Sequence, residues 1–286
     1  MSTAKAVERY LRSGDSDPMY SAWPGGLFER AKRGDDELLG ALVKEVKRRA
    51  AGRQHPAVPD HDLTSWARRK LTPMVHGLFP QIERAAVLAT LEKSVVFLTS
   101  ESVEQVLLGQ SWLRTAWDLA NLFLGSVEAD LLGPGAPRIL GLSQETTCYV
   151  SATYFEERGK TEDFVIHEAA HIFHNCKRRT VGLPETRTRE WLLHLEFRKR
   201  ETFAYSCEAY GWIVEHAASR TERMAMAEEF AKHGSRVNDE TVEPEELADI
   251  VREACAARNG WKVILGRCSL PKKLRRVALL ANGLRE

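Results

Sequence analysis

The sequence predicts an α+β protein that is predominantly α-helical, with a small antiparallel sheet and a helical N-terminal region. Most of residues 1–135 carry apolar side chains at helical spacing. Residues 138–155 are rich in Ile, Leu, Val, Tyr and Thr, a composition typical of β-strands. Helical patterns resume after Thr161. We therefore expect a helical region over residues 1–135 and a mixed domain over residues 136–286.

Composition excludes several classes of protein. The chain has 286 residues, enough for a full core in one or two domains. Its net charge of +1 gives no long-range attraction to nucleic acid or to an anionic membrane. No apolar run reaches the roughly 18 residues of a membrane span, and the N-terminus lacks the apolar stretch of a secretory signal. The five cysteines form no CxxC pair, which favours a reduced protein in the cytoplasm.

The first part of the N-terminal region predicts three helices, at residues 4–12, 27–51 and 63–71. Residues 14–26 form a loop rich in Gly, Pro, Asp and Ser, and two prolines within residues 53–60 break the next pattern. Pro73 and Pro80 are expected to bracket another irregular link.

The second part of this region is more apolar. Residues 81–98 predict one strongly apolar helix, and residues 102–132 predict one broken helix or two. Aromatic residues such as Trp112 and Trp117 recur at helical intervals, which favours a place in the core over a platform for nucleic-acid bases.

Residues 138–142 and 146–155 predict a β-hairpin with a turn near residues 143–145. The second strand immediately precedes the helix that carries His167 and His171. Its edge is either open, so that an extended peptide can join it by backbone hydrogen bonds, or closed, in a buried hairpin that covers the helix.

The remaining elements are mainly helical. Thr161 is the expected N-cap of a helix that runs to about residue 176, with Glu162 and Asp163 in its first turn. Residues 177–184 predict a loop. Further helices are expected at residues 188–220, in two pieces that meet near Arg198, at 222–233, and at 244–258 after Pro244. Residues 261–265 predict a short strand. The basic residues after it predict a solvated helix face: Lys272, Lys273, Arg275 and Arg276.

The helix expected after Thr161 carries the residues with the clearest chemistry. His167 and His171 lie one turn apart on the same face, so both imidazoles can reach one metal ion. Glu168 projects near that face, where it can take a proton from water. This HExxH spacing is typical of zinc sites with two histidine ligands and a glutamate base.

Two histidines need a third protein ligand to form a zinc site with one open position. No further histidine follows at the short spacing of extended HExxH motifs. The favoured ligand is Glu201, thirty positions after His171, because Ala204 one turn later is small enough to let two helices approach. The alternatives, in order of preference, are Glu208, Glu196, Glu190 and His194.

The segments HEAAH and ETFAY, within residues 146–216, resemble the gluzincin class of zinc metallopeptidases, in the compact version typified by ImmA/IrrE-like intracellular peptidases. The resemblance implies a zincin-like core with one Zn²⁺ ion. It also implies His167, His171 and Glu201 as ligands and Glu168 as general base. Residues 1–135 have no match to this class and are expected to serve in substrate recognition or regulation.

One position departs from that class. Four positions after the ligand glutamate, larger gluzincins often have an aspartate that supports a ligand histidine, and here Tyr205 stands there. Tyr205 or Glu208 is expected to accept the imidazole N–H instead. His174 shares the stripe of the two ligands and is expected to pack beside the site. The possible donors to an oxyanion are Tyr154, Tyr205, Tyr210, His174 and His216.

Together these features predict a cytoplasmic zinc metalloendopeptidase that hydrolyses peptide bonds of a protein or peptide substrate. Neither nucleic acid nor a membrane is an expected partner. The alternative is a non-catalytic binding or regulatory protein in which zinc stabilises a zincin scaffold. A third reading takes the HExxH match as accidental in a helical interaction protein.

Overall fold

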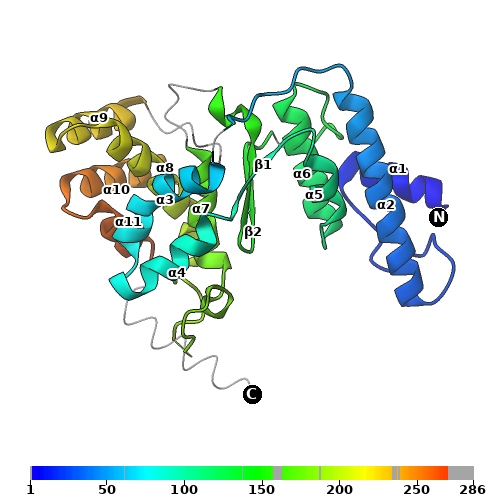
Figure 1. Cartoon of the computed structure of the whole chain (residues 1–286), viewed down its shortest axis with the longest axis horizontal. Coiled ribbons are helices and arrows are strands. Elements are labelled where there is room, and N and C mark those ends of the chain that lie inside the picture. Colours follow the sequence, from blue (N-terminus) through cyan, green and yellow to red (C-terminus); the bar gives the residue numbers. More distant parts are fainter. Residues whose placement is uncertain are drawn as a thin grey trace. The chain divides into compact units, whose positions relative to one another are not determined.

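The computed structural model describes residues 2–60, 62–136, 138–156, 163–186, 188–233, 237 and 239–269 (Figure 1). These residues are mostly helical and contain one small three-stranded sheet, which confirms the predicted α+β class. No helix in these ranges is both long and apolar enough to cross a lipid bilayer.

The chain divides into two compact units. The described residues of the first unit fall within Met1–Asp60, Phe97–Leu142 and Tyr149–Arg158, and those of the second within His61–Val96, Ser143–Cys148 and Gly159–Glu286. This division differs from the expected boundary at residue 135, because residues 62–96 belong to the unit that contains the HExxH helix.

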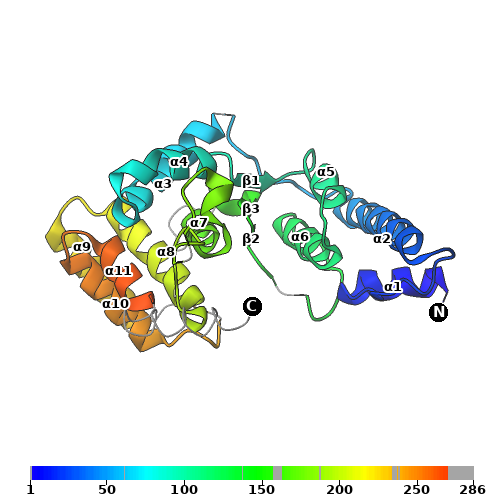
Figure 2. The same ribbon diagram turned by 90° about the horizontal axis from the view of Figure 1, so that it is seen from below.

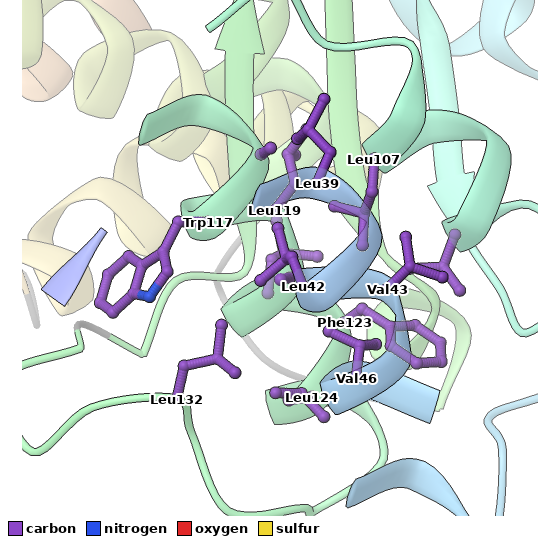
Figure 3. Close-up of a cluster of buried hydrophobic side chains, with 14 of the residues drawn as sticks. Leu39, Leu42, Val43, Val46, Leu107, Trp117, Leu119, Phe123, Leu124 and Leu132 are labelled. Atoms are coloured by element: carbon purple, nitrogen blue, oxygen red, sulfur yellow. The ribbon is translucent and has the colours of Figure 1, made fainter. Parts of the chain in front are cut away.

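The first unit contains four helices among its described residues: α1 (Thr3–Ser13), α2 (Leu27–Ala50), α5 (Val103–Leu108) and α6 (Leu113–Ser126). Figure 3 shows the apolar stripe of α2 packed against α5 and α6. Trp117 is 2% exposed and its indole N–H donates to the Leu11 carbonyl, so its predicted place in the core is confirmed. Trp112 is 67% exposed, and the same prediction is wrong for it.

The second unit contains seven helices among its described residues: α3 (Leu63–Leu78), α4 (Gln81–Leu91), α7 (Phe164–Asn175), α8 (Arg200–His216), α9 (Arg220–His233), α10 (Pro244–Ala256) and α11 (Gly260–Cys268). Helix α8 packs against α7, α10 and α11, as Figure 2 also shows. Helix α3 approaches α11 closely at Gly77, where an added Cβ would lie 2.1 Å from the Trp261 ring. The expected strand at residues 261–265 is therefore wrong, since these residues belong to α11, which Asn259 caps.

Two boundaries differ from the predictions in α3 and α4. Helix α3 continues through Pro73, and the turns after it bury Met74, Val75 and Leu78. That burial offsets the backbone hydrogen bond that proline cannot make. Helix α4 ends at Leu91, and the expected end of this helix is instead strand β1 (Val95–Leu98).

The three strands have the order β1–β3–β2, and the sheet is mixed rather than purely antiparallel as predicted. Strands β2 (Gly141–Gln144) and β3 (Thr147–Ser151) confirm the hairpin, which turns at Glu145 with a φ of 50°. Because β3 is the central strand, the open edge considered for residues 146–155 is wrong. Among the described strands, β2 and β1 form the two edges. Residues Ala152–Phe155 form a 3₁₀ helix, η1.

The expected helix at residues 188–220 is correct only from Arg200 onward. Before it, the segment crosses the end of α7: Leu192 N–H donates to the Cys176 carbonyl, and Leu193 N–H donates to the Phe173 carbonyl. These bonds satisfy backbone acceptors where α7 ends. The tertiary contact therefore outweighs the helical tendency of this stretch.

Asp163 caps the helix that carries the HExxH residues, because its carboxylate accepts the Ile166 N–H at 3.2 Å. The helix therefore begins at Phe164, two residues later than a cap at Thr161 implied. Thr161 and Glu162 lie outside the described residues, as does the basic stretch from Lys272 to Arg276.

Candidate metal centre

The structure brings together the three side chains that the sequence favoured as ligands. His167 and His171 come from α7 and Glu201 from the first turn of α8. The two Nε2 atoms are 3.1 Å apart, and Glu201 Oε2 lies 3.5 Å from that of His171 and 3.8 Å from that of His167. Within the described ranges, these three residues form a group that could hold a metal ion.

The separations of these atoms test whether zinc fits. A point in their plane that is equidistant from all three lies about 2.0 Å from each, which matches zinc–nitrogen and zinc–oxygen bonds of about 2.0–2.2 Å. Two imidazoles and one carboxylate are also a donor set found in catalytic zinc sites. The arrangement fits zinc, although such a donor set also accepts other divalent metals.

Glu208 supports His167 from behind. Its Oε2 lies 2.9 Å from Nδ1 of His167, and its Oε1 accepts the Asp163 backbone N–H at 2.8 Å. Burial alone would lower the pKa of His167, but the bond to Glu208 and the charges of Glu208, Glu168 and Glu201 raise it to about 9. The expectation that Glu208 accepts an imidazole N–H fits this geometry, which directs Nε2 toward Glu201.

Tyr205, which stands where an aspartate was expected, has a different contact. Its ring packs edge-on against His167, with ring centroids 4.5 Å apart. Burial and the nearby charges of Glu208 and Glu201 raise its pKa to about 12, so the phenol stays protonated at neutral pH. The carboxylate that contacts His167 Nδ1 from α8 is instead that of Glu208, three residues after Tyr205.

His174 supports the second imidazole. Its Nε2 lies 3.0 Å from Nδ1 of His171, and its Nδ1 lies 3.0 Å from Oδ1 of Asn175. Asn175 Oδ1 can only accept, so His174 carries its proton on Nδ1 and accepts from His171 through Nε2. Burial, together with the positive charges of His171 and Arg200, lowers the pKa of His174 to about 3, which keeps it neutral. Its expected place beside the site is consistent with these contacts.

Glu168 is 8% exposed and lies next to His167 in the chain. Burial raises its pKa, while the charges of His167 and His171 and a hydrogen bond from Ser143 oppose that shift. Ser143 belongs to the edge strand β2, and its interaction with Glu168 links this strand to the HExxH helix.

The other candidates have different surroundings. Glu190 pairs with Lys177 at 2.6 Å, and neither Glu196 nor His194 belongs to the metal-binding group in the described ranges. The Tyr210 hydroxyl accepts from the Gly260 N–H, and the His216 ring stacks on Trp212 at the end of α8.

Tyr154 belongs to the other compact unit, where its ring packs against Phe97 and Phe155. The remaining donors considered for an oxyanion are therefore Tyr205 and His174, and the second is already bonded to His171 and Asn175.

Sequence patterns gave no signal for a third contributor, Lys70 of α3. Its ammonium lies 2.5 Å from the carboxylate of Asp163, the N-cap of α7, and also pairs with Glu215 of α8. A residue 93 positions from its partner leaves no periodic trace in the sequence. Helix α3 therefore stabilises the start of α7 through an ion pair between residues far apart in the sequence.

We expect Glu208→Ala to weaken zinc binding about 10- to 100-fold, the usual cost of losing such a supporting group. The variant removes the acceptor of His167 Nδ1 and leaves the Asp163 N–H without its partner. Competition with a chromophoric chelator measures the affinity. Glu215→Ala is the matched control, because this residue lies seven positions later on α8 and contacts Lys70 rather than an imidazole. Equal affinities for both variants would contradict the assigned role.

Comparison of the chain with protein-family models, with curated proteins and with solved structures finds no match. The resemblance to gluzincins therefore remains a prediction carried by residues 146–216. The case for a function depends on the geometry around His167, His171 and Glu201.

Proposed function

We propose that the protein is a cytoplasmic zinc-dependent metalloendopeptidase of the zincin type that hydrolyses peptide bonds of a protein substrate. The observation that carries the proposal is the near-equal spacing of three ligand atoms, with a buried glutamate next to one of them. His167, His171 and Glu201 would hold one zinc ion. That ion would act as a Lewis acid, polarising a carbonyl group and lowering the pKa of water.

Glu168 is the proposed general base. Its carboxylate accepts one proton from the attacking water and then gives that proton to the nitrogen of the departing amine. The Ser143 hydroxyl lies close enough to this carboxyl to lower its pKa. Glu208 and His174 fix the two ligand imidazoles, each through the ring nitrogen that faces away from Glu201. Tyr205, whose ring packs against His167, is the favoured donor to an oxyanion.

Strand β2 is the proposed binding edge for the substrate. It is an edge strand among the described residues, and Ser143 on it contacts Glu168. An extended peptide that adds to this edge would form backbone hydrogen bonds beside the proposed base. The edge first considered, on residues 146–155, is not open, because β3 pairs with β1 on one side and with β2 on the other.

Removal of metal tests the proposal. The protein is stripped with a chelator and then reconstituted with one equivalent of Zn²⁺, and mass spectrometry detects cleavage of a pool of random peptides. We expect cleavage only after reconstitution, because without the ion neither the attacking water nor the scissile carbonyl is activated. Stoichiometric zinc that raises the melting temperature without any cleavage would instead favour the non-catalytic scaffold. A chain that binds no zinc would leave the HExxH match accidental.

A further inference from the structure

Arg200 lies next to the ligand Glu201 and has no acidic partner within the described part of the chain. It is the first residue of α8, and Glu201 is the second. Its Nε–H is buried and meets no acceptor in the described ranges. The neighbouring cation Lys199 differs, since it pairs with Glu246 of α10. A buried donor on a charged group without a partner is uncommon in folded proteins and calls for an explanation.

An aromatic ring fixes the position of this guanidinium. The Cζ atom of Arg200 lies 4.9 Å from the centroid of the Phe197 ring, and Phe197 is 77% exposed. This contact is a cation–π interaction, which holds the guanidinium against the ring. The ring lies against one face of the guanidinium, whose N–H donors lie in the plane of the group and do not point at the ring.

The location of Arg200 connects it with the metal centre. It directly precedes the proposed ligand Glu201 in the first turn of α8, the helix that faces α7. The centre itself gathers the carboxylates of Glu168, Glu201 and Glu208, and each of them already interacts with a described histidine. Arg200 thus adds a cation at the margin of the site that no described carboxylate neutralises.

We propose that Arg200, stacked on Phe197, binds a carboxylate of the substrate beside the metal centre. The planar guanidinium matches a carboxylate in two parallel hydrogen bonds, which a lysine cannot reproduce. The substrate class is therefore peptides with a carboxylate close to the scissile bond, supplied either by an Asp or Glu side chain or by a free C-terminus. The inference rests on the proposed peptidase function and specifies what that site selects.

A peptide pool with randomised positions tests this proposal, made once with free C-terminal carboxylates and once with C-terminal amides. We expect Arg200→Gln to lower kcat/KM for carboxylate-bearing peptides about tenfold or more, with little change for neutral ones. Phe197→Leu should reduce it about two- to fivefold, the worth of an exposed cation–π contact. If Arg200→Gln loses cleavage only in the pool with free C-termini, the recognised carboxylate is the C-terminus. If it loses cleavage of peptides with acidic side chains in both pools, the recognised carboxylate belongs to Asp or Glu.

Arg198→Gln is the matched control, because it removes an exposed cation two residues away at the same helix end. Circular dichroism and zinc content verify that each variant is folded and loaded. Equal cleavage profiles for the wild type and Arg200→Gln, or equal losses in Arg200→Gln and Arg198→Gln, would overturn the proposal.

Binding separates this inference from the proposed hydrolysis. If the wild type cleaves neither pool, the same pools are passed over immobilised zinc-loaded Glu168→Gln protein. Retention of carboxylate-bearing peptides that depends on Arg200 would support the subsite and refute the peptidase function. Retention that does not depend on Arg200 would refute the subsite.

Discussion

Replacing Glu168 by Gln is expected to lower peptide hydrolysis about 10²- to 10⁴-fold, the usual contribution of a general base, without loss of bound zinc. The amide has the size of the carboxylate, but it cannot take a proton from water. None of the three ligand atoms is changed. Steady-state cleavage of the best peptide from a random pool, with zinc content measured on the same sample, checks both parts of the prediction.

Glu201→Gln is the matched comparison, because it makes the same chemical change on the neighbouring helix at a proposed ligand. We expect this variant to lose zinc as well as activity, since an uncharged amide is a weaker ligand than a carboxylate. A Glu168→Gln variant that cleaves at the wild-type rate would refute the role of the base. Equal zinc loss in both variants would show that Glu168 contributes to metal binding.

The sequence allowed prediction of those parts of the site that depend on local geometry. His167 and His171 are four residues apart and therefore share one face of a helix. The length of a helical turn follows from backbone hydrogen bonding alone. The sequence also indicates Glu201 as a ligand, with Glu208 as the first alternative, because the small Ala204 lets a second helix approach the first. The sequence does not decide which of the two glutamates is the ligand and which supports a histidine, because that choice depends on how far α8 is shifted along α7.

The errors arose where distant contacts decide backbone conformation. The run from Val95 to Leu98 is apolar and fits a buried helix or a strand equally well, and pairing in the sheet decides for β1. Residues 188–196 were predicted to be helical, yet the N–H groups of Leu192 and Leu193 bond to carbonyls at the end of α7. Pairs such as Lys70 with Asp163 are separated by too many residues for any pattern to reveal them.

The ion pair between Glu83 and Arg178 is another contact of this kind, and it leads to the largest expected effect on stability. Arg178 is 1% exposed and Glu83 is 6% exposed. The guanidinium donates to both carboxylate oxygens, at 2.8 and 3.3 Å, and its Nε–H donates to the Pro184 carbonyl. Arg189 also donates to Glu83 at 2.9 Å, but its side chain is half exposed. The pair joins α4 to the segment that follows α7.

Glu83→Ala is expected to lower the free energy of unfolding by about 3–5 kcal/mol, because it leaves the Arg178 charge buried without its counterion. Urea denaturation followed by circular dichroism measures this change. Adding Arg178→Met should recover much of the loss, since an apolar side chain of similar length has no charge to desolvate. A double variant as unstable as Glu83→Ala would contradict this explanation and indicate lost packing instead. The measurement involves neither zinc nor substrate, so it tests the contact between α4 and the segment after α7 independently of the proposed peptidase activity.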